Sequence, residues 1–149
     1  MNYLEYLKDK DKNEEFECFG GVSQNLIKDI EDKLKVAFPQ NYKEYLNQCG
    51  TIGFGDSYIF GLFTDFDNEV ETGNVFMETK KYRLEIELPN DYIVLEADED
   101  ENIILLKISD TNDCGVYSVD ILEKENLTYI KQFDGFEDYF KNFIISLID

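Results

Sequence analysis

Near the C-terminal end of the chain, large apolar side chains recur with the period of an α-helix. They stand at positions i, i+3, i+4, i+7, i+8 and i+11, namely Phe136, Tyr139, Phe140, Phe143, Ile144 and Leu147. Asp134, with an acidic residue three positions further on, suits the N-cap of this helix. A helix with one continuous apolar stripe must bury that stripe against another element. We expect a β-sheet to supply the large apolar surface that the stripe needs.

Four short apolar runs before this helix are typical of β-strands. They cover residues 92–97, 103–108, 116–121 and 127–133, and residues that favour turns separate them. Consecutive strands with links this short pair antiparallel, because a parallel pair needs a crossover of about a dozen residues or more. The second half of the chain therefore predicts an antiparallel sheet.

Helical patterns dominate the first half. A short helix is expected within residues 2–11, and a brief strand at residues 16–18. Ser23 is a plausible N-cap for a second helix, and Pro39 suits the first position of a third. Gly50 then fits the left-handed residue that often follows a helix.

The middle of the chain is harder to assign. Glycines at positions 53, 55 and 61 punctuate an aromatic segment, which favours tight turns and close approach of strands. Residues 69–82 leave helix and loop open, because Gly73 interrupts the apolar pattern. Nothing divides the chain into parts, so we predict a single α+β domain over residues 1–149, a mainly antiparallel sheet with helices packed against it.

The charge of the chain limits its partners. It has 33 acidic and 14 basic residues and no histidine, which gives a formal net charge of −19. Such a chain is repelled by phosphate backbones and by anionic membrane surfaces, so we expect no nucleic-acid partner and no membrane binding. A basic protein is attracted, although the same charge can also serve solubility alone.

Residues that catalysis and cofactor binding need are scarce. Without histidine, the usual Ser-His-Asp and Cys-His arrangements are absent, and so is the commonest zinc ligand. Cys18, Cys49 and Cys114 form no CxxC pair, which indicates free thiols in a reducing compartment. No signal peptide or membrane-spanning run is apparent. We therefore predict a cytoplasmic protein with no cofactor, no metal and no catalytic residue.

Three weaker signals of chemistry remain, and we interpret the first two as structural. The run from Gly50 to Gly55 lacks the lysine of a phosphate-binding loop and is better explained as a turn. Asp98, Asp100 and Asn102 have the spacing of calcium ligands, but the glycine and glutamate of a calcium loop are missing. A carboxylate pair for glycoside hydrolysis needs a cleft, which a sequence does not reveal.

Several motifs together resemble the SUKH superfamily, which includes bacterial toxin-immunity proteins. They are an apolar–x–x–Glu helix, a Pro-x-x-Tyr-x-x-Tyr-Leu helix, a glycine turn, an aromatic-Gly-Leu strand and the closing aromatic helix. Here they are carried by Ile27, Ile30-Glu31, Phe38-Pro39-Gln40-Asn41-Tyr42, Tyr45-Leu46, Gly50, Ile59-Phe60-Gly61-Leu62 and Phe136-Tyr139-Phe140. Phe38 stands where leucine is usual, and the chain has no tryptophan.

The resemblance implies an immunity protein that binds a secreted polymorphic toxin, a nuclease in the simplest case, and occludes its basic active-site surface. Charge on the rim of such an interface sets association rate and partner choice, whereas buried aromatic anchors provide affinity. The candidate contact residues are therefore acids and one ring in turns and in the aromatic segment: Asp56, Tyr58, Asp65, Asp67, Asp98, Glu99, Asp100 and Glu101. Each is equally compatible with an ordinary turn acid or sheet tyrosine.

Two other functions stay open. A regulatory adaptor, similar to eukaryotic members linked to cell-wall synthesis and signalling, would bind a larger assembly and would not rescue poisoned cells. A carboxylate hydrolase would need a deep pocket with two acids about 5–9.5 Å apart.

Overall fold

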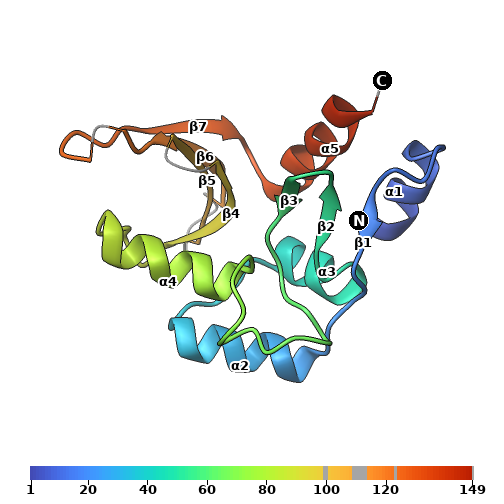
Figure 1. Ribbon diagram of the computed structural model, residues 1–149, viewed down its shortest axis with the longest axis horizontal. Coiled ribbons are helices and arrows are strands. Elements are labelled where there is room, and N and C mark those ends of the chain that lie inside the picture. Colours follow the sequence, from blue (N-terminus) through green and yellow to red (C-terminus); the bar gives the residue numbers. More distant parts are fainter. Residues whose placement is uncertain (99–100, 109–113, 123, 149) are drawn as a thin grey trace.

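The computed structural model describes residues 1–98, 101–108, 114–122 and 124–148, and the elements found there are shown in Figure 1. The helices are α1 (Tyr3–Lys10), α2 (Gln24–Leu34), α3 (Gln40–Gln48), α4 (Val75–Glu85) and α5 (Phe136–Leu147). The strands are β1 (Glu17–Cys18), β2 (Ile52–Phe54), β3 (Ser57–Ile59), β4 (Tyr92–Asp98), β5 (Asn102–Lys107), β6 (Val116–Asp120) and β7 (Tyr129–Phe133).

The larger sheet confirms the predicted antiparallel pairing. Strands β4, β5, β6 and β7 lie side by side in chain order, and each pairs antiparallel with the next. Helix α4 lies beneath this curved sheet (Figure 1), where Thr79 accepts a hydrogen bond from the Val94 amide at 3.1 Å. The fold is α+β, as the sequence predicts.

A second, smaller sheet forms in the first half of the chain. The expected brief strand is present as β1, and it pairs with the β2–β3 hairpin in the order β1-β2-β3. The Phe60 amide donates to the Leu95 carbonyl at 2.7 Å, so the end of this hairpin is joined to the larger sheet. Residues of both sheets therefore form the protein surface at this junction.

The helix boundaries follow local signals, with two corrections. Ser23 caps α2 as predicted, its hydroxyl accepting from the Leu26 amide at 3.1 Å. Pro39 lies one position before the first residue of α3, as its N-cap. Asp134 does not cap α5: Gly135 occupies the N-cap without a side-chain bond, and the Asp134 carboxylate instead lies 3.7 Å from the Lys131 ammonium. The ambiguous segment 69–82 yields α4, which begins only after Gly73.

Helix α5 packs differently from the expectation. Its stripe was expected to lie on the sheet, but the Phe136 ring sits among aromatic rings of α1 and α3. Its centroid lies 5.7 Å from Tyr3, 5.3 Å from Tyr42 and 5.2 Å from Tyr45. Tyr139 is the ring that reaches the larger sheet: it contacts Phe133 of β7 and donates a hydrogen bond to Glu96 of β4. Aromatic rings on two other helices thus supply an apolar surface that strand periodicity does not reveal.

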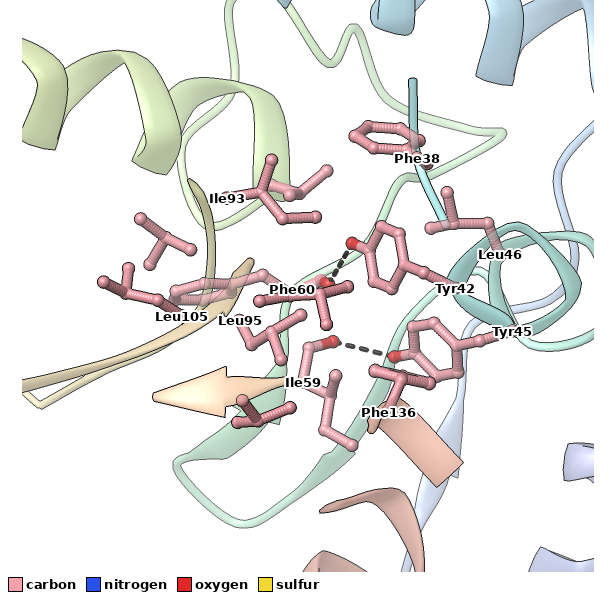
Figure 2. Packing of buried hydrophobic residues seen from close by; sticks show 14 of the residues in the cluster. Phe38, Tyr42, Tyr45, Leu46, Ile59, Phe60, Ile93, Leu95, Leu105 and Phe136 are labelled. Atoms are coloured by element: carbon pink, nitrogen blue, oxygen red, sulfur yellow. Dashed lines mark hydrogen bonds between the residues drawn. The ribbon is translucent and has the colours of Figure 1, made fainter. Parts of the chain in front are cut away.

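Two tyrosines of α3 tie the helical layer to the smaller sheet. The Tyr42 hydroxyl donates to the Phe60 carbonyl at 2.7 Å, and the Tyr45 hydroxyl donates to the Ile59 carbonyl at 2.8 Å (Figure 2). Tyr45 also accepts from the Ile52 amide at 3.0 Å. Both side chains are fully buried, so these bonds satisfy backbone groups that water cannot reach.

Replacing Tyr45 with phenylalanine should lower the free energy of unfolding by about 1–3 kcal/mol, because the Ile52 amide and the Ile59 carbonyl lose their buried partner. Urea unfolding of the variant measures the loss. Tyr6→Phe is the control, since the Tyr6 hydroxyl makes no hydrogen bond within the described residues. Equal stability of the two variants would contradict this role of Tyr45.

Two glycines let backbone segments approach closely behind the hairpin. Gly50 follows α3 with φ +69°, the left-handed conformation predicted for it. A Cβ at Gly61 would lie 1.7 Å from the Gly50 carbonyl oxygen, and the Leu62 amide donates to that same oxygen at 3.1 Å. The family-like Gly61 is therefore a packing requirement of the scaffold.

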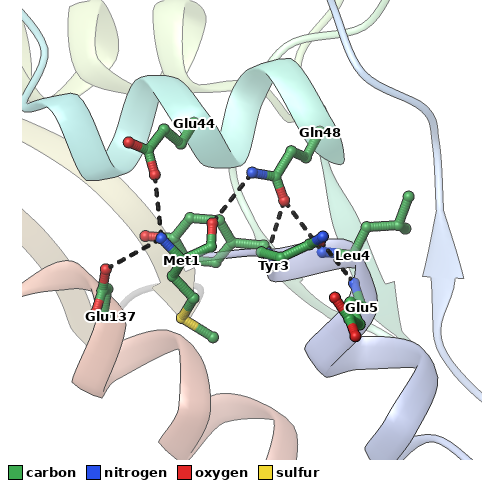
Figure 3. A network of polar contacts seen from close by, with 8 residues as sticks. Met1, Tyr3, Leu4, Glu5, Glu44, Gln48 and Glu137 are labelled. Atoms are coloured by element: carbon green, nitrogen blue, oxygen red, sulfur yellow. Dashed lines mark hydrogen bonds and ion pairs between the residues drawn. The ribbon is translucent and has the colours of Figure 1, made fainter.

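Polar contacts hold the first residues against α3 and α5 (Figure 3). The Gln48 side chain accepts from the Tyr3 amide at 2.7 Å and donates to the Met1 carbonyl at 3.2 Å. The Met1 amino group lies 3.4 Å from Glu44 and 3.7 Å from Glu137. Helix α1 is thereby fixed over the aromatic core.

Candidate partner-binding surface

A groove lies where the β2–β3 hairpin meets the ends of β4 and β5. We call it the sheet groove; its volume is about 840 Å³. It is lined by Asp56, Ser57, Tyr58, Phe60, Glu96, Ala97, Asp98, Asn102 and Ile104. Both acidic and apolar side chains line it, so it offers both charge and apolar contact. A shallower depression of about 390 Å³ shares Ser57, Glu96 and Ile104 with the groove and continues towards β7 and α5.

Aromatic rings extend from this groove across the surface of the smaller sheet. Tyr58 contacts Phe19 at a centroid distance of 6.3 Å, Phe19 contacts Phe63 at 5.2 Å, and Phe63 contacts Phe66 at 5.3 Å. We call these four rings the aromatic ladder. The last ring of the ladder, Phe66, is 53% exposed.

Local geometry fixes both ends of the ladder. Tyr58 lies directly opposite Gly53, and its ring covers that glycine so closely that a Cβ there would lie 2.4 Å from the ring. At the other end, the buried Asn68 amide closes a loop by accepting from the Phe63 amide at 2.9 Å and donating to the Phe63 carbonyl at 2.8 Å. The loop that carries Phe66 is therefore held in one shape.

Acidic side chains flank the ladder. Asp56 lies beside Tyr58 in the hairpin turn, while Asp65 and Asp67 stand on either side of Phe66, and all three residues are exposed. None of them forms an ion pair with any residue in the described ranges, although Asp67 accepts from the Glu69 amide at 3.0 Å. Their negative charge is therefore not neutralised by a neighbouring lysine there. An apolar ring with an anionic rim resembles the centre and edge of a protein interface.

Glu96 adds a carboxylate to the wall of the groove. It is half-buried on β4 and accepts a hydrogen bond from the Tyr139 hydroxyl at 2.5 Å. Burial raises the pKa of this carboxyl above its ordinary value of 4.5, and the Tyr139 bond opposes that rise only in part. Strand alternation alone gave no reason to single out Glu96.

The raised pKa of Glu96 predicts how its removal changes stability with pH. The folded protein holds this proton more tightly than the unfolded chain, so stability falls as pH rises from about 4.5 through the folded-state pKa. Glu96→Gln abolishes this loss. Relative to wild type, the variant should therefore gain stability as pH rises above about 4.5 and through the folded-state pKa of Glu96. Urea unfolding across this range tests it, with the exposed Glu71→Gln as the control for removing one charge. A difference that stays constant with pH, or shrinks, would contradict the assignment.

The structure brings some candidate contact residues together and separates others. Asp56, Tyr58 and Asp98 all line the sheet groove, and the hairpin that bears the first two leads to the loop of Asp65 and Asp67. Glu101 is exposed in the link between β4 and β5 and does not line the groove. The remaining two, Glu99 and Asp100, lie outside the described residues.

The sequence-based candidate residues did not include three rings of the ladder, Phe19, Phe63 and Phe66, or the Asn68 side chain that closes the loop (the Asn68 clasp). Phe19 precedes a glycine pair, and α2, α3 and the β2–β3 hairpin separate it from Phe63 in the chain, so its contact depends on the tertiary fold. Phe66 had a local signal, since a large ring between two aspartates is unexpected in a solvated loop. Asn68 had no local sequence signal, because a buried loop amide is recognised only from its hydrogen bonds in the structure.

Comparison with known protein families identifies the family of the chain. A family model described as SMI1-KNR4 cell-wall, within the SUKH group, matches residues 1–145. The chain belongs to the SUKH superfamily. The match covers every helix and strand from α1 to β7 and most of α5. The resemblance inferred from the sequence motifs is therefore confirmed. No curated protein matches the chain. In the part of this SUKH protein that the structure describes, no helix is long and apolar enough to cross a membrane.

Proposed function

We propose that this SUKH protein acts in the cytoplasm as an immunity protein, binding a secreted polymorphic toxin and blocking its active site without catalysis. The toxin is a nuclease, and the bound surface is its basic substrate groove. The observation that carries the proposal is the acid-flanked aromatic ladder, which ends in the exposed Phe66. SUKH membership supports a role of this type.

The two parts of the surface have different physical roles in this proposal. A net charge of −19 attracts a basic nuclease over long range and can raise the association rate towards about 10⁸–10⁹ M⁻¹s⁻¹ at low salt. Charge alone gives rapid encounter but not a long-lived complex. The rings of the aromatic ladder lengthen the lifetime of the complex, because well-packed aromatic anchors contribute most of the binding free energy at such interfaces.

Preorganisation makes Phe66 suitable as an anchor. The Asn68 clasp and the contact with Phe63 hold the ring before any partner arrives. A partner therefore does not have to order the loop on binding, which lowers the entropic cost of association. The neighbouring aspartates would surround the buried ring with charge that suits lysine and arginine.

A regulatory adaptor remains the second candidate, because the matching family is described by its link to the cell wall. An adaptor could use the same rings, but it would not inhibit a nuclease. The two functions are separated by activity and not by binding.

The test begins by identifying the coding sequence next to this gene; a toxin domain found there is produced alone and assayed with a labelled DNA or RNA substrate. Increasing amounts of the SUKH protein should abolish cleavage at about one molecule per toxin molecule. Cells expressing the toxin should survive when the SUKH protein is coexpressed. Full cleavage at saturating SUKH protein, or poisoned cells despite its expression, would contradict the immunity function and favour the adaptor.

A further inference from the structure

Two cysteines that are distant in sequence meet next to Phe19, a ring of the aromatic ladder. Cys18 is exposed on β1, and Cys49 is buried directly after α3. Pairing of Cys18 with Ile52, together with the bond from the Phe19 amide to the Thr51 carbonyl at 3.0 Å, brings them together. The Cys18 thiol donates a hydrogen bond to the Cys49 carbonyl oxygen at 3.6 Å, so the Cys18 sulfur lies against the residue that bears the second thiol.

The two thiols are in different chemical environments. The hydrogen bond from the Cys49 thiol lowers the pKa of Cys18 to about 6, with help from the Gly20 backbone and Lys8 and against the effect of partial burial. The same bond and deeper burial raise the pKa of Cys49. The exposed sulfur is thus the better nucleophile and the buried one stays protonated. Cys114, before β6, takes no part in this pair.

We propose that Cys18 and Cys49 form a redox-modifiable pair, in which Cys18 reacts with a peroxide and Cys49 resolves the product into a disulfide. In the first step the Cys18 thiolate attacks one oxygen of hydrogen peroxide; the O–O bond breaks, and the released hydroxide takes a proton to leave as water. In the second step the Cys49 sulfur attacks Cys18 sulfenic acid, the S–O bond breaks, and the Cys49 proton leaves with the hydroxide as a second water. The dithiol is oxidised by two electrons and one peroxide is reduced.

The disulfide would join β1 to the end of α3. It would close a loop that contains α2 and α3, and it would fix β1, which Phe19 of the ladder directly follows. Constraining a loop of this length disfavours the unfolded chain, so the oxidised protein should melt roughly 5–15 °C above the reduced protein. This inference does not depend on the proposed toxin partner.

The experiment treats the full chain with hydrogen peroxide and maps the products by mass spectrometry. Wild type and Cys114→Ser should both lose two hydrogen atoms and yield one linked peptide pair containing Cys18 and Cys49, reversibly with dithiothreitol. Cys49→Ala should instead accumulate Cys18 sulfenic acid, trapped by dimedone. Cys18→Ser, at an exposed position, should react with peroxide at least about 10-fold more slowly than wild type.

Three results would overturn the inference. The first is an absence of the Cys18–Cys49 bond in peroxide-treated wild type. The second is peroxide consumption by Cys18→Ser at the wild-type rate. The third is an oxidised protein whose Tm is no higher than that of the reduced protein, because the native fold would then not hold the two sulfurs in position for a disulfide.

Discussion

Replacing Phe136 with alanine is expected to lower the free energy of unfolding by about 3–5 kcal/mol, the range for truncating a buried aromatic ring. The Phe136 side chain is 2% exposed and joins three helices, since this α5 ring contacts Tyr3 of α1 and both Tyr42 and Tyr45 of α3. Its removal leaves a cavity where those helices meet. Domains of this kind are stable by only about 5–15 kcal/mol, so the loss should be evident in urea unfolding.

Ile145→Ala is the matched control for Phe136→Ala, because Ile145 lies on the same helix and is 49% exposed. It should cost less than about 1 kcal/mol. If both substitutions had the same small effect, the aromatic centre described for this fold would be wrong.

Replacing Phe66 with alanine should weaken the complex with the toxin domain by about 2–4 kcal/mol, or about 30–700-fold in dissociation constant. The Phe66 ring is 53% exposed in the free protein, so its loss should leave folding nearly unchanged. Isothermal calorimetry measures the affinity, and urea unfolding of the same samples checks stability.

Leu84→Ala is the control for this binding experiment. Leu84 is 85% exposed on α4, away from the ladder, and its truncation removes a comparable apolar side chain. We expect wild-type affinity from it. Equal losses from both variants would show that exposed apolar area, and not this ring, determines binding.

Local patterns predicted the elements of this fold well. The four long strands and α5 have periodic apolar residues and short links, and Ser23 and Gly50 have the chemistry of helix ends. The prediction of Asp134 as the N-cap of α5 was wrong for a local reason. Asp134 and Gly135 are adjacent candidates for this position, and Lys131 provides an ionic partner for the aspartate.

Contacts between distant segments were not predictable in the same way. The position of α5 depends on rings from α1 and α3, which lie more than 90 residues earlier in the chain. The candidate site likewise combines local features, which the sequence predicts, with contacts between distant segments, which it does not. Asp56 and Tyr58 belong to a local hairpin and could be proposed from the sequence, whereas Glu96 joins them only because the Phe60 amide bonds to β4. The contact of Cys18 with Cys49 likewise requires the pairing of β1 with β2.

Amide hydrogen exchange of the SUKH protein, free and in complex with the toxin domain, tests most directly whether the acid-flanked ladder is the binding surface. Binding should slow exchange in residues 57–67, which carry Tyr58, Phe63 and Phe66, and leave α2 and α4 unchanged. Slower exchange confined to α2, α4 or the outer strand β7, with residues 57–67 unaffected, would contradict the account.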